Sequence, residues 1–480
     1  MGTPVHIHGV GAAAPEWRLP AADVSAAWGR RGGKTVVAVC APDEDPLTLA
    51  VAAALDALEA AGLGALEIDA VFWGCSRPPF ADGPSHAVLT NALGVSSHAG
   101  GALFVGSPHS GIEALLAGAD AVAAGSARNV LVIASDAVIP GPGSAFETRC
   151  GAGAAALVLT AVPGPATITT RVTRSHPLLD RYRGDGETDL RDLYDARLFR
   201  EEMFLPFVGE VAEHLAPLDI RAWSLPDPDG RLGGIVAKRV GATAVASDVA
   251  YRALGDTGAA AALLGGVLGL DAAGNVAIVA HGGGRTTGVV VTADHAVPGA
   301  GRAALRIAEP GPTVGYTAVL RTRGQLQPSG ETIPMGVPPE SALFARGADE
   351  MLQLLGGRCT ECGTINTPPS IHPTCIACGG SKLEPVSLAR HGVVHTFVIN
   401  QTMPAPFVAP LPIAVVDLDD GARVMLQVIG DGTDVAIGSQ VDLVLRRYAH
   451  ERGVPVYGYK SKVRPVEPES ETETETGGPV

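Results

Sequence analysis

Residues 68–94 read IDAVFWGCSRPPFADGPSHAVLTNALG, an apolar strand followed by a proline-rich turn and a helix that ends in Leu-Gly. Residues 219–241, DIRAWSLPDPDGRLGGIVAKRVG, repeat this layout and place a tryptophan at the same point of the strand. A layout that recurs within one chain is typical of a duplicated unit. The sequence therefore predicts two similar strand-helix halves.

The segments that follow the two copies also match. They are GSPHSGIEALLAG (106–118) and NVLVIASD (129–136) after the first copy, and GDTGAAAALLGG (255–266) and NVAIVAHGGG (275–284) after the second. In each, a turn opens a small-residue helix that leads to a fully apolar strand, the pattern of a helix packed closely on a buried sheet. We expect a pseudo-twofold α/β core over residues 1–305, with halves of about 1–165 and 166–305.

The segment between the halves, residues 180–206, is rich in charged residues. Leu190, Tyr194 and Leu198 recur every four residues in it, which predicts an amphipathic surface helix. Two interpretations stay open, a solvated insertion and a lid over a substrate site.

The chain after the core changes character. Residues 306–338 are rich in Gly, Pro and Thr and are predicted to be a linker. Residues 339–390 should hold a short helix and a cysteine-rich ribbon. Apolar runs separated by Pro-rich or Asp-Gly turns then predict a small antiparallel barrel over 391–466, and the acidic tail 467–480 should be disordered.

Four of the seven cysteines form two C-x2-C pairs separated by twelve residues: Cys359, Cys362, Cys375 and Cys378. This spacing predicts a structural zinc site, because four thiolates complete a tetrahedral shell and leave no position for a substrate. His372 and His391 are not needed as ligands. The isolated Cys40, Cys75 and Cys150 are expected to be small core residues.

Composition excludes several classes of partner. The chain has 480 residues and a formal charge of −15, and its Lys and Arg residues are scattered. Nucleic acid and anionic membranes require a basic footprint, so neither is an expected partner. The N-terminus shows no secretory signal and no apolar run reaches about 18 residues, so a cytoplasmic location is expected.

Two family resemblances add to this interpretation. The C-terminal region resembles the zinc-ribbon plus OB-fold proteins associated with acyl-CoA thiolases and hydroxymethylglutaryl-CoA synthases. It shares the cysteine pairs with Pro368 and Pro369 between them, a strand start at Gly392, PIAVVDLDDG (412–421) and RPV (464–466). The N-terminal region is similar to the thiolase superfamily, closest to ketoacyl synthase III and hydroxymethylglutaryl-CoA synthase, through GAGAAALVL (151–159) and AHGGGRTTG (280–288). The resemblance implies a duplicated five-layer core.

The thiolase resemblance also implies a Cys nucleophile, a His, and an Asn or a second His, and here the chain departs from it. These positions fall on Pro108, Asp227 and Asp256. The resemblance leaves as candidate catalytic residues Ser107, His109, Asp227 and Asp256, and as candidate substrate-binding residues Ser110, Gly283 and Gly284, the two glycines through an oxyanion hole.

Each candidate also has a structural interpretation. Ser107, Ser110 and Asp256 are suited to cap a helix, Asp227 to stabilise its Pro-flanked turn, and His109 to be a hydrogen-bonded residue of a turn.

Three hypotheses follow. The first is an enzyme that processes acyl-CoA or acyl-carrier-protein thioesters without a Cys nucleophile, forming or cleaving a C–C or ester bond as an aldolase-like lyase or as an acyltransferase using Ser107. The second is a catalytically inactive subunit that binds acyl-CoA for a partner enzyme. The third, a conventional synthase with a shifted alignment, is disfavoured because no Cys lies within thirty residues of Pro108. The resemblance implies a homodimer or a complex with a related subunit, with residues 96–105 at the interface.

Overall fold

The computed structural model describes residues 3–177, 179–192, 196–326, 341–403, 407, 409–451 and 454–465. The chain divides into two compact units. The first comprises most of residues 1–331 together with Leu445–Gly458, and the second comprises Ala345–Val444 and the residues from Tyr459 onward.

The first unit is built on a nine-stranded sheet in the order β11-β12-β13-β8-β1-β7-β6-β4-β5. Its strands are β1 (His6–Ala13), β4 (Ala70–Gly74), β5 (Gly100–Phe104), β6 (Asn129–Ala137), β7 (Ala152–Thr160), β8 (Ala166–Ser175), β11 (Ile220–Ser224), β12 (Gly274–Gly282) and β13 (Arg285–Ala293). Strands β4-β6-β7-β1 and β11-β12-β13-β8 have the same order and the same one parallel and two antiparallel pairings. The predicted duplication is therefore visible in the sheet, whose halves join where His6 and Ile7 of β1 pair with β8.

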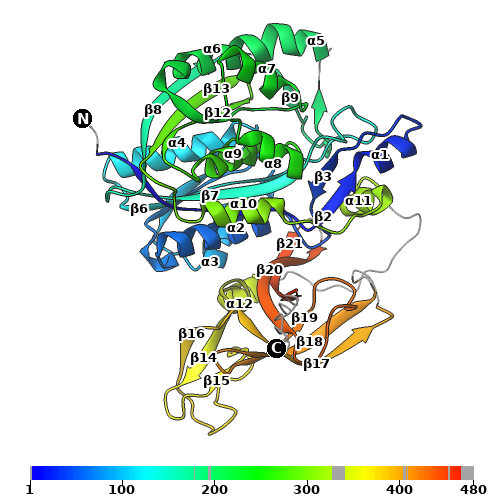
Figure 1. Ribbon diagram of the computed structural model, residues 1–480. Helices are drawn as coiled ribbons and strands as arrows, with labels where there is room; N and C mark the ends of the chain where they lie inside the picture. Colours follow the sequence, from blue (N-terminus) through cyan, green and yellow to red (C-terminus); the bar gives the residue numbers. More distant parts are fainter. Residues whose placement is uncertain are drawn as a thin grey trace, which may run out of the picture. The chain divides into compact units, whose positions relative to one another are not determined.

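Helices complete a five-layer arrangement (Figure 1). The central layer is α4 (Ser110–Ala123) and α9 (Ala261–Gly269); α2 (Pro46–Ala61) and α3 (Ser85–Leu93) cover one outer face, and α6 (Leu205–Leu215) and α7 (Leu232–Arg239) cover the other. A Cβ added to Gly111 of α4 would lie 2.1 Å from the Ala259 carbonyl oxygen. The small residues of the predicted central helices are thus required for close packing.

The described part of the predicted linker, residues 306–326, contains helical structure. It contains α11 (Tyr316–Thr322), which buries Tyr316 and Val319 in a cluster with Leu19 and Val37. These partners belong to the β2 (Trp17–Pro20) and β3 (Val36–Val39) hairpin, which flanks α1 (Ala21–Ala27). The pattern failed here because one helix with two buried residues is too short for a periodic signal.

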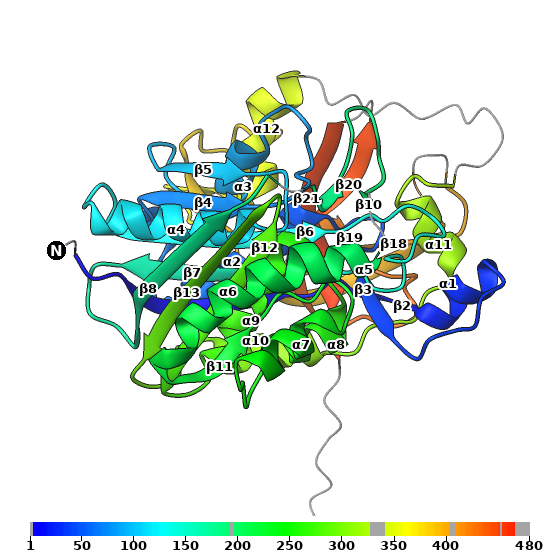
Figure 2. The same ribbon diagram turned by 90° about the horizontal axis from the view of Figure 1, so that it is seen from above.

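The helix predicted between the halves forms only in part. Residues 181–192 instead form a small hairpin of β9 (Arg181–Tyr182) and β10 (Arg191–Asp192), with Gly186 at φ +73° in the turn. Helical structure begins at α5 (Ala196–Leu198) and continues through a π-helical turn (Phe199–Phe204) into α6, which lies over β12 and β13 (Figure 2). Tyr194 lies outside the described residues.

The remaining helical elements of the first unit are the helices α8 (Ser247–Leu254) and α10 (Ala300–Ala308) and the 3-10 turns Ala65–Glu67, Ala216–Leu218 and Gly258–Ala260. In the described part of the chain, no helix combines the length and the apolar character that crossing a membrane requires.

The C-terminal part of the chain holds a ribbon and a barrel, and Leu445–Gly458 of its last two strands are counted with the first unit. After α12 (Ser341–Gln353), the ribbon strands are β14 (Leu355–Cys359), β15 (Ile365–Asn366) and β16 (Leu383–Ser387). The barrel sheet runs in the order β19-β18-β17-β20-β21, formed by β17 (His391–Asn400), β18 (Leu411–Leu418), β19 (Arg423–Gln427), β20 (Gln440–Glu451) and β21 (Val454–Val463). A bridge between Val428 and Ser461 brings the edge strands together, so the predicted antiparallel barrel is present and is nearly closed. The tail 467–480 lies outside the described residues.

Candidate functional site

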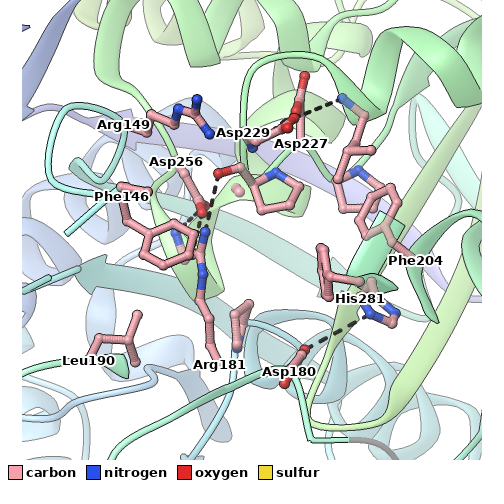
Figure 3. Close-up of a pocket in the computed structure, with 18 of the residues that line it drawn as sticks. Phe146, Arg149, Asp180, Arg181, Leu190, Phe204, Asp227, Asp229, Asp256 and His281 are labelled. Atoms are coloured by element: carbon pink, nitrogen blue, oxygen red, sulfur yellow. Dashed lines mark hydrogen bonds and ion pairs between the residues drawn. The ribbon is translucent and has the colours of Figure 1, made fainter. Parts of the chain in front are cut away.

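A cavity of about 580 Å³ lies in the first unit beside the N-terminal ends of α4 and α9 (Figure 3). Pro108 lines it from the turn before α4, and Gly258 and Ala261 line it from the start of α9. Its volume is in the range of small-molecule sites. The cavity therefore lies where the thiolase resemblance placed the reactive groups.

Asp180 and His281 form a buried pair in the wall of this cavity (Figure 3). His281 Nε2 lies 3.9 Å from Asp180 Oδ2, and the two side chains are only 6% and 10% exposed. The Gly283 N–H donates to Asp180 Oδ1 at 3.3 Å, and His281 Nδ1 lies 2.8 Å from Thr286 Oγ1. Both side chains are thus held in place by neighbours on β12, β13 and the turn between them.

The environment of this pair shifts the pKa values of both side chains in the direction that favours their neutral forms. Burial raises the pKa of Asp180. Burial, together with repulsion from His109 and His176, lowers the pKa of His281 to about 4. At pH 7 the imidazole is therefore neutral.

The neutral imidazole predicts a pH-dependent stability. The imidazole of an unfolded His titrates near pH 6.5. Between pH 6.5 and 4, His281 is therefore protonated in the unfolded chain but not in the folded chain. The free energy of unfolding falls as the pH falls through this range. From pH 7 to 4.5 the wild type should lose roughly 2–3 kcal/mol more than the His281→Asn variant. Denaturant unfolding followed by tryptophan fluorescence measures this, because Trp17, Trp28, Trp73 and Trp223 all belong to the first unit. Equal losses in the two proteins would contradict a buried neutral His281.

Asp256 lines the cavity but its carboxylate is engaged in an ion pair. Its Oδ2 accepts from Arg181 Nη1 at 2.5 Å, with both side chains below 10% exposed, and its Oδ1 accepts from the Gly258 N–H at 3.0 Å. Arg181 also donates to the Pro228 carbonyl and lies over the Phe146 ring. Asp256 therefore stabilises its own turn and joins it to Arg181 in the wall of the cavity, and its catalytic role stays a prediction.

Asp256→Asn should destabilise the first unit by about 3–5 kcal/mol, because it removes the carboxylate from a buried guanidinium. Asp185→Asn is the matched control, since Asp185 is exposed, and should change the stability by less than about 0.5 kcal/mol. Denaturant midpoints measured by tryptophan fluorescence test both. An Asp256→Asn protein of wild-type stability but without activity would point to a catalytic role instead.

Asp227 also lines the cavity, and its carboxylate accepts from its own turn. Oδ1 receives the N–H groups of Gly230 at 2.8 Å, Arg231 at 3.0 Å and Asp229 at 3.3 Å. Burial and the neighbouring Asp229 carboxylate raise the pKa of Asp227 to about 6. The turn-stabilising interpretation accounts for its geometry, and its catalytic role stays a prediction.

Ser107, His109 and Ser110 surround the start of α4 but do not line the cavity. Ser107 Oγ accepts from the His109 N–H at 3.2 Å, and Ser110 Oγ accepts from the Ser107 N–H at 3.4 Å. His109 is 1% exposed, with Nε2 2.8 Å from Thr287 Oγ1 and Nδ1 3.3 Å from Glu113. These three residues therefore belong to a hydrogen-bonded turn, and their side chains do not face Asp227 and Asp256 across the cavity.

Gly283 and Gly284 also lie outside the cavity lining. Both have left-handed backbones, at φ +59° and +72°, and the Gly283 N–H is the one that donates to Asp180. A Cβ on Gly282 would lie 2.8 Å from Pro108 Cδ, so the two halves do meet at the predicted turn. The oxyanion-hole role stays a prediction, and in this structure the Gly283 amide already has an acceptor.

Sequence reasoning missed Asp180 and His281 as site residues. His281 stands within the AHGGGRTTG segment, which served only as a family mark, and Asp180 opens the charged insertion. A histidine beside a Gly-rich turn at the end of a buried strand was the available signal.

The four cysteines of the ribbon converge as predicted. Their Sγ atoms all lie within 4.8 Å of one another, with Cys359 to Cys378 at 3.6 Å and Cys362 to Cys375 at 3.5 Å. A tetrahedral site with Zn–S bonds near 2.3 Å needs S···S distances of about 3.8 Å, so this donor set fits zinc.

The two cysteine pairs are held by equivalent knuckles. In each, the glycine after the second cysteine donates its N–H to the carbonyl of the first: Gly363 to Cys359 at 2.9 Å and Gly379 to Cys375 at 2.8 Å. Both glycines have left-handed backbones. Backbone N–H groups of Cys378 and Ala377 lower the pKa of Cys375 to about 6, which favours the thiolate that binds metal.

Comparison with known proteins places both parts of the chain. Hydroxymethylglutaryl-CoA synthase of Aeropyrum pernix is 30% identical over 283 residues, which cover 56% of this chain and 78% of the relative. The chain belongs to the hydroxymethylglutaryl-CoA synthase family. A structure of a synthase of this family complexed with CoA matches with a TM-score of 0.56 and 16% identity, covering 66% of this chain and 90% of that chain, which supports the thiolase-like fold.

The C-terminal part has relatives of its own. The family model for the C-terminal OB-fold domain of ChsH2 matches residues 385–446. A DUF35 domain-containing scaffold protein of Methanocaldococcus jannaschii is 37% identical over 123 residues, covering 24% of this chain and 86% of the relative. The predicted fusion of a synthase-like core with an OB-fold domain is confirmed.

Proposed function

We propose that this member of the hydroxymethylglutaryl-CoA synthase family processes acyl thioesters of CoA or acyl-carrier protein, and that it forms or cleaves a C–C bond beside the thioester without a cysteine nucleophile. The observation that carries the proposal is the buried Asp180–His281 pair in the cavity beside the Pro108 turn. No cysteine is among the described residues that line this cavity. Burial raises the pKa of Cys75 well above its usual range, so its thiol stays protonated.

The pair suits an aldol or retro-aldol step. In the cleavage direction, the Asp180 carboxylate accepts the proton of a β-hydroxyl group, the bond between Cα and Cβ breaks, and its electrons form the thioester enolate. Neutral His281 donates a hydrogen bond to the enolate oxygen, and the proton held by Asp180 returns to Cα. The proton removed from the hydroxyl group is the one delivered to Cα, so the step needs no further reagent.

Acyl transfer through Ser107 has less support. Its hydroxyl lies outside the cavity lining and accepts from the His109 N–H, so neither a substrate carbonyl nor a free base faces it. We therefore favour the lyase or aldolase chemistry over the transferase chemistry.

Arg149 offers a contact for the anionic part of the substrate. It lines the same cavity, and no hydrogen bond or ion pair of its guanidinium joins it to another residue that the structure describes. A phosphate of CoA or of a phosphopantetheine arm would match this group.

A second candidate is a catalytically inactive subunit that binds acyl-CoA and scaffolds a partner enzyme. Its support is that Ser107, Ser110 and Asp256 each accept a backbone N–H of their own turn, together with the relative named as a scaffold protein. In both proposals zinc holds the ribbon and takes no part in the chemistry. β5, within the predicted interface segment 96–105, is an edge strand of the sheet and suits pairing with a second thiolase-like subunit.

The test is turnover of a thioester panel. Pure protein is incubated with acyl-CoA and β-hydroxyacyl-CoA thioesters, and the carbonyl and acyl-CoA products of C–C cleavage are followed together with free CoA. Cleavage products without free CoA support the lyase, and CoA binding without any turnover supports the scaffold. Acyl transfer through Ser107 would be supported by two results together: release of free CoA, and a covalent adduct in the intact mass that is lost in Ser107→Ala.

A further inference from the structure

A second cavity of about 370 Å³ lies in the first unit at the carboxyl ends of β4 and β6. It shares no lining residue with the cavity that holds Asp180 and His281. Its walls come from the start of α2, the loops after β4 and β6, and the segment at the end of α11. The proposed reaction involves none of these residues.

Four arginines line this second cavity: Arg77, Arg321, Arg323 and Arg447. Arg323 Nη1 is buried and has no hydrogen-bond partner among the residues that the structure describes. Arg77 Nη1 donates to the Thr188 carbonyl, and within the described chain no carboxylate lies in ion-pair range of Arg77 or Arg323. Burial lowers the pKa of both guanidinium groups, and it outweighs the opposite effect of the Glu147 carboxylate on Arg323 and of the Asp189 and Asp136 carboxylates on Arg77.

The two acidic residues that line the cavity are already engaged. Glu44 accepts from the N–H groups of Glu16 and Ala41, each at 3.0 Å, and pairs with Arg446. Asp45 caps α2 through two N–H groups and accepts from the Tyr457 hydroxyl at 2.6 Å. Neither carboxylate therefore neutralises the side of the cavity that Arg77 and Arg323 form.

Part of the remaining lining is apolar. Val39, Pro78, Val138 and Ile139 contribute carbon surface to the same cavity. A volume near 370 Å³ is at the small end of the range for ligand sites. The lining thus suits a compact molecule with one anionic end and a short apolar body.

We propose that this cavity is a second ligand site, which binds a small organic anion by placing its carboxylate or phosphate group against Arg323 and Arg77. Guanidinium groups match either oxyanion with paired hydrogen bonds. The ligand supplies the charge that a buried, unmatched guanidinium lacks. The proposal stands apart from the proposed reaction, because the two cavities have no residue in common.

The test is calorimetric titration of the full chain with three probes that share one body: butyl phosphate, butyrate and butanol. We expect heat of binding for at least one anion and none for butanol. Arg323→Gln and Arg77→Gln should each weaken the anion at least about tenfold, the effect of losing one hydrogen bond to a charged group. Arg30→Gln is the matched control, because Arg30 is exposed and outside the cavity, and it should bind as the wild type does.

The outcomes separate cleanly. Preference for butyl phosphate or for butyrate identifies the anionic group, and either supports the site. Absence of anion binding by the wild type at about 10 mM, a concentration that detects even millimolar affinity, would overturn it. Wild-type affinity in the Arg323→Gln/Arg77→Gln double variant would overturn it as well. If Arg323→Gln fails to fold by circular dichroism, Arg77→Gln, whose guanidinium makes a contact to one carbonyl, decides the question.

Discussion

Asp180→Asn is expected to lower kcat for the preferred thioester by about 10²–10⁴-fold, the usual contribution of a positioned general base. The substitution keeps the size of the side chain and can still accept from the Gly283 N–H, so the fold should be unchanged. His281→Ala should cause a loss of similar size, because the enolate oxygen loses its donor. Steady-state kinetics on the substrate found with the thioester panel measures both.

The controls for this prediction come from the same region. Asp185→Asn removes an exposed carboxylate and His295→Asn an exposed imidazole, and both proteins should retain wild-type kcat. The Asp180→Asn/His281→Ala double variant should lose little more than the worse single variant, because the two groups act on one step. If Asp180→Asn is fully active while Asp227→Asn is not, the base is Asp227 and the proposed roles are wrong.

Removal of zinc is the second change for which a large effect is expected. Cys375→Ser should abolish zinc binding and unfold the ribbon, since apparent zinc-binding energies of about 10–16 kcal/mol are folding energies in such small sites. Metal analysis should find one zinc per chain in the wild type and none in the variant. Limited proteolysis should then cut the variant between β14 and β16.

This effect should be confined to the second unit. All four tryptophans belong to the first unit, so tryptophan fluorescence reports its stability separately from the ribbon. Cys40→Ser is the control that alters a cysteine outside the cluster, and it should keep its zinc. A Cys375→Ser protein that retains a full equivalent of zinc would show that the four-thiolate assignment is wrong.

The candidate site shows where prediction from sequence stopped. The turn before α4, the LPDPDG turn and the GDTG turn were all located correctly, because each opens a helix after a recognisable strand. Yet the side-chain oxygens of Ser107 and Asp227 accept hydrogen bonds from neighbouring backbone N–H groups, and the Asp256 carboxylate is paired with Arg181. A polar residue at the start of a helix can cap it or face a cavity, and the two uses share the same sequence pattern.

By itself the sequence determined the duplicated α/β core, the antiparallel barrel and the cysteine cluster. Each of these rests on local periodicity or on residue spacing, so it can be recognised in a contiguous stretch of sequence. Only the tertiary structure decided that Asp180 and His281 meet in the cavity. They lie far apart in sequence, and the end of β12 and the segment after β8 bring them within 3.9 Å. The direction of a side chain and the loss of its water depend on neighbours from distant segments, and no local pattern records them.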